Sequence, residues 1–217
     1  MPYKVIVFDF DDTLVQTRAI RYEAAIYTAK QFYDLEITDS TIDKYWGLPF
    51  RDLIKALFGD IDSFENIAQH YKEIIHLFPL KKFDDAVATL ERLSNKYILT
   101  MVSSSTKELI KRGFMDVGIS YDIFAYIQAS EDSDHHKPDG KVFDSLKNFL
   151  NKKGIKYSEA IYIGDSLDDY IAAKNADIDF LGVARFDKRE KEFEENNAKY
   201  VKNLREITQY LKTLINE

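Results

Sequence analysis

The chain of 217 residues contains no cysteine. This absence excludes disulfide bonds, cysteine-based zinc sites and thiol nucleophiles, and it is compatible with a reducing compartment. Long apolar runs are missing too, because no stretch approaches the roughly 20 residues that a membrane-spanning helix needs. The first residues, MPYKVIVFDFDD, reach acidic residues after a short apolar run, so we expect no signal peptide. We therefore expect a cytoplasmic protein without a membrane partner.

Basic residues are the minority among the charged residues. The chain has 30 Lys and Arg residues against 37 Asp and Glu residues, which gives a net charge of −7. This balance argues against nonspecific binding to nucleic acid or to acidic membranes. The length allows one large domain, or a domain with a small satellite, that buries a substantial core. We expect no nucleic-acid partner, and either a monomer or a weak homodimer.

Several nucleotide-binding and metalloprotease motifs are absent as well. The chain has no GxxxxGK[ST], GxGxxG or HExxH sequence, which disfavours P-loop proteins, dinucleotide-binding folds and zinc proteases. His135 and His136 are adjacent, and neighbouring residues on a regular element do not easily present both rings to one metal. We interpret them as loop residues.

Short apolar runs alternate with helical patterns along most of the chain. The runs are bounded by polar or turn residues and predict buried parallel strands. The predicted strands are residues 4–8, 97–102, 124–128, 160–163 and 180–184, and the predicted intervening helices are residues 84–95, 106–117 and 141–152. This alternation predicts an α/β fold with a doubly wound, Rossmann-like parallel sheet.

One segment interrupts the alternation. Between the first strand and residue 84 we find no convincing strand, only amphipathic helical patterns at residues 18–34, 50–58 and 64–77. These patterns predict a small α-helical domain inserted after the first strand, with Pro79 in the linker that leads back. We expect residues 1–15 and 79–217 to form the core domain, and residues 16–78 to form the inserted helical domain.

Reactive side chains follow the predicted strands, where ligands bind in open α/β sheets. The segments are Asp9-Phe10-Asp11-Asp12-Thr13, Ser103-Ser104-Ser105, His136-Lys137-Pro138 and Gly164-Asp165-Ser166-Leu167-Asp168-Asp169. Taken in this order, they resemble the four motifs of the haloacid-dehalogenase-like superfamily. The resemblance covers nearly the whole chain, and the inserted helices resemble the cap domain of that superfamily. It implies a phosphohydrolase whose cap closes over the site.

The first motif carries the chemistry that the resemblance implies. A carboxylate nucleophile splits the hydrolysis of a phosphate ester into two easier displacements, and the resemblance assigns this role to Asp9. Side chains two residues apart lie on the same side of an extended chain. Asp11 is therefore placed to protonate the leaving oxygen and later to deprotonate water.

The resemblance also assigns residues that bind phosphate and metal. Thr13, Ser103, Ser104 and Lys137 are expected to contact the phosphoryl group, with Lys137 neutralising its charge. The expected cofactor is Mg²⁺, a hard cation that prefers oxygen ligands. Its implied ligands are Asp9, Asp165 and the backbone carbonyl of Asp11, with Asp169 acting behind them.

Structural roles compete with these assignments. Ser105 begins a sequence typical of a capping box, as does Ser166 with Asp169 three residues later. Asp168 is typical of a solvated acid in the first turn of a helix. Lys137 also fits an ordinary surface lysine, and the pair Asp9 and Asp11 fits an acidic turn.

The branch of the family is narrowed by Asp11, because the dehalogenases of the superfamily lack an acid at that place. The helical cap resembles that of phosphoglycolate phosphatases and β-phosphoglucomutases, so we expect a small phosphorylated metabolite as the substrate. Arg51 is the leading candidate for a substrate contact from the cap, since a guanidinium suits carboxylate or phosphate groups. Arg18 and Arg21 are further candidates, and a solvent-facing role for Arg51 stays open.

Three functions are compatible with the sequence. The leading hypothesis is a magnesium-dependent phosphatase that hydrolyses a phosphoglycolate-like or sugar-phosphate-like monoester through an aspartyl-phosphate. The first alternative is a sugar phosphomutase, which differs in the acceptor of the phosphoryl group. The second is a catalytically idle module that binds a ligand or partner, and the complete set of motif residues argues against it.

Overall fold

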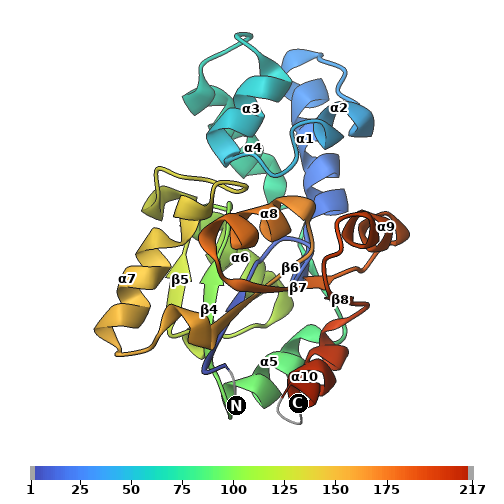
Figure 1. The fold of residues 1–217 in the computed structure, drawn as a ribbon. Helices are drawn as coiled ribbons and strands as arrows, with labels where there is room; N and C mark the ends of the chain where they lie inside the picture. The colour runs from blue at the N-terminus through green and yellow to red at the C-terminus, as the bar shows by residue number, and fades with distance from the viewer. Residues whose placement is uncertain (1–2, 215–217) are drawn as a thin grey trace.

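The computed structural model describes residues 3–214, and a six-stranded parallel sheet lies at its centre (Figure 1). The order of the strands is β5-β4-β1-β6-β7-β8. Their bounds are Val5–Phe8 for β1, Ile98–Val102 for β4, Tyr126–Gln128 for β5, Ala160–Gly164 for β6, Asp179–Val183 for β7 and Tyr200–Val201 for β8. The five predicted strands are confirmed, and each of their boundaries lies within two residues of its predicted position.

Both faces of the sheet are buried, as the continuous apolar runs require. In β1, Ile6 and Phe8 pack into one apolar cluster, and Val5 and Val7 pack into another on the opposite face. The first cluster includes side chains of α5 (Ala86–Ser94), α6 (Lys107–Val117) and α10 (Leu204–Thr213). The second includes side chains of α7 (Asp144–Lys152) and α8 (Leu167–Ala176), so the sheet is doubly wound as predicted.

Four helices form a separate helical unit beyond one edge of the sheet (Figure 1). They are α1 (Arg18–Tyr33), α2 (Asp39–Asp43), α3 (Phe50–Phe58) and α4 (Phe64–Ile75). Their apolar faces pack into a cluster of their own, which contains Ile42, Ile54 and Ile67. The inserted helices are thus confirmed, and the short α2 is an addition that the sequence pattern did not predict.

A two-stranded ribbon joins the helical unit to the rest of the fold. Strand β2 (Val15–Gln16) pairs antiparallel with β3 (Lys81–Lys82), and these strands lie just before α1 and just after α4. Sequence reasoning predicted no strand here, because two residues are too few to show an alternating pattern. The ribbon holds the two chain connections of the helical unit side by side.

The final part of the chain also exceeded the prediction. Strand β8 extends the sheet beside β7, the charged helix α9 (Asp187–Glu195) contacts α8, and helix α10 contacts α5 on the other face of the sheet. Figure 1 shows α10 beside α5, far from the helical unit. Across residues 3–214, none of the helices combines the length and apolar character that crossing a membrane requires.

Two helix starts test the predicted capping boxes. Ser166 caps α8, since its hydroxyl accepts from the Asp169 N–H while the Asp169 carboxylate accepts from the Ser166 N–H. At α6 the prediction was wrong by one residue, because Thr106 is the cap and accepts from the Leu109 N–H. The Ser105 hydroxyl instead donates to Asp11, so Ser105 belongs to the site described next.

Candidate active site

A buried charge network begins at Asp9, directly after β1. Lys137 donates from Nζ to Asp9 Oδ1 at 2.6 Å, to Asp169 Oδ1 at 2.6 Å and to the Tyr162 hydroxyl at 2.9 Å. The three charged side chains are at most 8% exposed. Burial lowers the pKa of Lys137, but the charges of Asp169 and Asp9 outweigh it and raise this pKa well above its ordinary value. Lys137 is therefore a cation held between two acids, and its interpretation as an ordinary surface lysine is wrong.

Both carboxylate oxygens of Asp169 accept hydrogen bonds from protein groups. Its Oδ1 accepts from Lys137 and, at 2.7 Å, from the Tyr162 hydroxyl, while its Oδ2 accepts from the N–H and hydroxyl of Ser166. Burial raises the pKa of Asp169, but Lys137 and these hydrogen bonds reverse that effect and lower it overall. The carboxylate thus fastens Lys137 to the start of α8.

Asp165, at the end of β6, completes a cluster of buried carboxylates. One oxygen each of Asp9, Asp165 and Asp169 lies within 4.8 Å of the others. Burial raises the pKa of Asp165 well above its ordinary value, and burial raises the pKa of Asp9 to about 8 against the opposing charge of Lys137. Arg189 of α9 is the nearest cation to Asp165, with Nε 3.5 Å from Oδ2.

These acids fit a hard divalent cation. Asp9 and Asp165 offer carboxylate oxygens in a buried place where a further positive charge would favour the ionised forms. Asp169 already accepts from Lys137, Tyr162 and Ser166, so it suits the support of that site better than direct coordination.

Asp11 lies beside Asp9 and contacts the helical unit. Its Oδ2 accepts from the Ser105 hydroxyl at 2.6 Å, and its Oδ1 lies 2.8 Å from Nη1 of Arg21 on α1. The same Arg21 nitrogen donates to the Ser105 hydroxyl at 2.9 Å. Since Arg21 is only 11% exposed, a cation of the helical unit is buried against the second acid of the first motif.

The turn between β1 and α1 depends on Asp12, a residue that sequence reasoning left without a role. Its φ of 53° lies in the left-handed region, where Asp is tolerated better than most residues. Its carboxylate accepts from the backbone N–H groups of Thr17 and Arg18 at the start of α1. Asp12 thereby turns the chain and satisfies the first N–H groups of the helix that carries Arg21.

A pocket of about 200 Å³ lies between these charged groups and the helical unit. It is lined by Asp9, Asp11, Lys137 and Asp165, and also by Ser104, one of the serines expected to contact phosphate. Two expected phosphate contacts, Thr13 and Ser103, are buried and do not line it. The Ser103 hydroxyl accepts a hydrogen bond from the Ser105 N–H. The contacts of Thr13 and Ser103 with phosphate stay predictions.

The expectation for Arg51 is not met in this structure. Its guanidinium donates to Glu65 at 3.0 Å and stacks on the Phe64 ring at 4.0 Å, and both charged partners are more than 60% exposed. Position 51 lies on the side of α3 that faces α4 and solvent, so Arg51 does not line the pocket. Arg18 and Arg21 of α1 line it instead.

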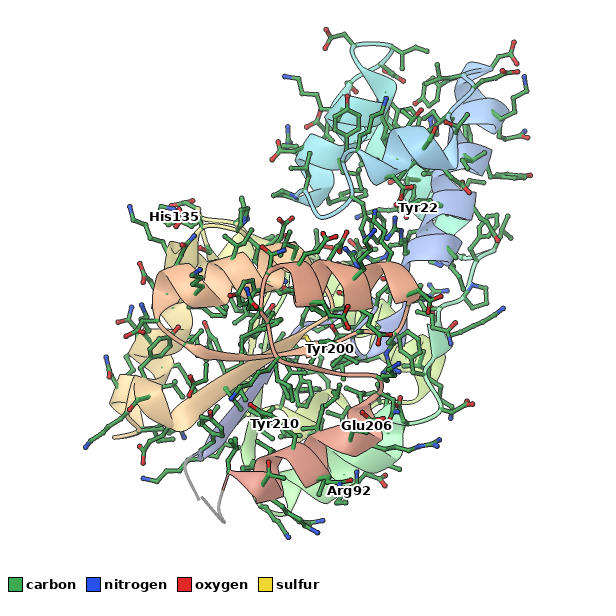
Figure 2. The ribbon with its side chains drawn as sticks, turned by 45° about the vertical axis from the view of Figure 1, so that its right-hand side comes forward. Tyr22, Arg92, His135, Tyr200, Glu206 and Tyr210 are labelled. Carbon is green, nitrogen blue, oxygen red and sulfur yellow. The ribbon has the colours of Figure 1, made fainter. Side chains whose placement is uncertain are left out.

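The remaining expectations concern polar residues near the loops. Asp168 is exposed in the first turn of α8, as predicted, and it also lines the pocket. His135 pairs with Asp139 in an exposed loop, and Figure 2 shows it far from Tyr22, which lies where α1 approaches the sheet. The loop interpretation of His135 is confirmed.

Two buried partners of the acids were missed by sequence reasoning. Tyr162 is fully buried within β6 and reads as an ordinary core aromatic. Arg189 lies in a highly charged stretch, and only its place at the first turn of α9 brings it to Asp165. The one available signal for Tyr162 is its position two residues before the GDSLDD segment.

Comparison with known proteins places this geometry in a family. The family model for haloacid dehalogenase-like hydrolases matches residues 6–183. A Clostridium perfringens protein named "Putative pyrophosphatase PpaX" is 31% identical over 185 residues, which cover 83% of each chain. A phosphoglycolate phosphatase of Agrobacterium fabrum is 26% identical, over 82% of this chain and 78% of its own.

A solved structure shows the same fold over almost the whole length. The Bacillus subtilis HAD-hydrolase YfnB, described as bound to magnesium, has a TM-score of 0.77 at 17% identity. The match covers 98% of this chain and all of that one. At this identity the likeness concerns the fold alone.

Proposed function

The chain belongs to the haloacid dehalogenase-like hydrolases, and from this premise we propose that it is a magnesium-dependent phosphatase of a small phosphate monoester. The observation that carries the proposal is the network in which Lys137 joins Asp9 to Asp169 beside Asp11 and Asp165. A purely structural acid pair needs no buried lysine and no second carboxylate cluster. The arrangement has the nucleophile, the acid and the cation that phosphoryl transfer requires.

In the first step, a carboxylate oxygen of Asp9 bonds to phosphorus while the bond from phosphorus to the leaving oxygen breaks. The leaving oxygen takes a proton from Asp11, which Arg21 and Ser105 hold at the pocket. Lys137 balances the charge of the phosphoryl group from its place beside Asp9. The product of this step is an aspartyl-phosphate on Asp9 and a free alcohol.

In the second step, water attacks phosphorus and gives its proton to Asp11, and the bond to Asp9 breaks to release inorganic phosphate. Asp9, Asp165 and the backbone carbonyl of Asp11 would hold Mg²⁺, which supplies further neutralisation of the phosphoryl charge when bound. Asp169 would keep Lys137 and the start of α8 in place. We infer that residues 16–78 act as a cap that covers the pocket and limits its access to water and large substrates.

Phosphate release from p-nitrophenyl phosphate in the presence of Mg²⁺ tests the proposal. We expect hydrolysis that chelation abolishes and that Ca²⁺ fails to support, because Ca²⁺ prefers more ligands in a looser geometry. A crystal soaked with beryllium fluoride and Mg²⁺ should show the adduct on Asp9. Turnover that survives complete removal of divalent cations would contradict the metal site.

The phosphomutase alternative shares the same acids and is separated by its product. Incubation with sugar phosphates should release inorganic phosphate from a phosphatase, whereas a mutase returns an isomerised sugar phosphate. The idle-module alternative predicts no turnover of any monoester by a correctly folded protein.

A further inference from the structure

The two sides of the pocket differ sharply in chemistry. The sheet side carries the carboxylates and Lys137. The opposite side is built largely from apolar side chains that are only partly covered by their neighbours. They are Trp46, Leu48, Phe50 and Leu53, and the helical unit also lines the pocket with Arg18, Arg21 and Asp43.

The exposure of this wall is clearest at Leu48, which is 43% exposed and lines the pocket from the loop between α2 and α3. Trp46, Phe50 and Leu53 pack only their inner surfaces against the apolar cluster of the helical unit. Exposed apolar area of this kind in a concave site is stabilised by an apolar ligand group that removes it from water.

The cations that line the pocket already have anionic partners. Each has a carboxylate within 4.0 Å, and no further Lys or Arg among residues 3–214 lines the pocket. The pairs are Arg18 with Asp43, Arg21 with Asp11, Lys137 with Asp9 and Asp169, Arg189 with Asp165 and Glu192, and Lys188 with Glu192. A second anionic group on the substrate would find acids and apolar surface rather than an available cation.

Arg51 sharpens this contrast. It is the cation nearest to the apolar wall in sequence, two residues before Leu53, and its guanidinium is directed to Glu65 outside the pocket. The stretch from Trp46 to Leu53 thus presents apolar surface to the pocket, and the two arginines with which the helical unit lines it, Arg18 and Arg21, are already paired with carboxylates.

From this wall we infer that the substrate is a phosphate monoester whose leaving group is an uncharged, largely apolar alkyl or aryl alcohol. The inference rests on the proposed phosphatase function and names its substrate class. It departs from the expectation of a phosphoglycolate-like or sugar-phosphate-like substrate. It also differs from the activity in the name of the Clostridium perfringens relative, because pyrophosphate has a second anion in place of the alcohol.

A series of straight-chain alkyl phosphates tests the inference. Ethyl, butyl and hexyl phosphate all release primary alcohols, so they differ in apolar area and hardly in the chemistry of the leaving oxygen. We expect kcat/KM to rise about two- to fourfold for each methylene until the wall is covered. Phosphoglycolate and pyrophosphate should fall below butyl phosphate. A flat alkyl series, or a preference for either anionic substrate, would overturn the inference.

The variant Leu48→Arg gives a second and independent readout. Position 48 is exposed, so an arginine fits there without disturbing a core, and it places a cation on the apolar wall. The ratio of kcat/KM for pyrophosphate to that for hexyl phosphate should increase at least about tenfold. Ile61→Arg is the matched control, since Ile61 is 48% exposed in the helical unit and lies outside the pocket. It should leave the ratio unchanged.

The outcomes separate the two proposals. If the wild-type protein hydrolyses neither p-nitrophenyl phosphate nor any alkyl phosphate with Mg²⁺, the phosphatase function itself fails. If it hydrolyses these esters but Leu48→Arg and Ile61→Arg shift the ratio equally, the wall does not select the leaving group, and the substrate inference alone is wrong.

Discussion

The edge of the sheet and the helical unit differ in how far their ion pairs are exposed to water. At the edge, Lys137, Asp9 and Asp169 are nearly inaccessible to water and bind one another in a single arrangement. In the helical unit, Arg51 and Glu65 form a pair in which each side chain is more than 60% exposed. Exposed pairs of this kind are screened and contribute little, whereas a buried charge that loses its partner is costly.

The difference teaches where the protein tolerates change. Removing Lys137 leaves Asp9 and Asp169 without their buried counter-charge, so a substitution there disturbs both the site and its surroundings. Apart from Arg18, Arg21 and Asp43, the helical unit lines the pocket mostly with apolar side chains, each of which can be exchanged without breaking a charge network. We therefore propose that phosphoryl chemistry takes place at the sheet edge and that the helical unit selects the leaving group.

The largest expected effect lies at the edge. Asp9→Asn removes the proposed nucleophile with almost no change in shape, so turnover should fall by about four orders of magnitude or more. The measurement is phosphate release by protein free of other phosphatases. Asp168→Asn is the matched control, because Asp168 lines the same pocket but is exposed, and it should retain most activity. Comparable losses in both variants would contradict the covalent role of Asp9.

A large effect on stability is expected where charge is buried behind the site. Arg185 pairs with Asp85 at 3.0 Å, and Arg185 also donates to the backbone carbonyl of Thr13. Asp85→Asn leaves the buried guanidinium without its counter-charge and should lower the free energy of unfolding by about 3–5 kcal/mol. Urea unfolding measures this value. Glu65→Gln, which breaks an exposed pair, should leave the urea midpoint nearly unchanged, and equal losses would remove the contrast between the two regions.

An intermediate effect is expected at Arg21, whose buried ion pair with Asp11 joins the helical unit to the sheet edge. Arg21→Met removes a group that, with Ser105, holds the Asp11 carboxyl in place at the pocket, so kcat/KM for an alkyl phosphate should fall about 10- to 100-fold. The fall should be smaller with p-nitrophenyl phosphate, whose leaving group needs less protonation. Arg21→Lys should restore part of the loss. Equal losses with both substrates would show that Arg21 supports the fold rather than positioning Asp11.

The smallest effect is expected at Arg51. Because its guanidinium contacts Glu65 and Phe64 rather than the pocket, Arg51→Gln should change kcat/KM by less than about twofold on every substrate. Steady-state kinetics with a short alkyl phosphate and with phosphoglycolate measure this. A selective loss with phosphoglycolate would mean that Arg51 reaches the substrate in another arrangement of the helical unit.

Particular residues show which parts of the fold could be predicted from the sequence. Continuous apolar runs predicted the central strands, because a strand buried on both faces has little choice of residue type. The helix predicted at residues 106–117 ends as expected at Val117, where Gly118 follows with a φ of 71° in the left-handed region. The two-residue strands β2 and β3 were not predicted, because their pairing joins segments 66 residues apart and leaves no local pattern.

The sequence by itself determined the placement of the reactive groups on the sheet edge. Each motif follows a parallel strand, and parallel strands bring their carboxyl ends to one edge whatever the intervening segments do. Asp9 and Asp11 share a direction for the same local reason, since they are two residues apart in an extended chain.

Only the tertiary structure decided which partner each side chain meets. Arg21 reaches Asp11 while Arg51 meets Glu65, and Arg189 approaches Asp165 from a highly charged helix. These pairings depend on how α1, α3 and α9 are oriented in the folded protein. Long cationic side chains occur on many surfaces, so their presence in the sequence does not identify their partners. Arginines that are alike in sequence therefore acquire different roles through packing, which local pattern does not encode.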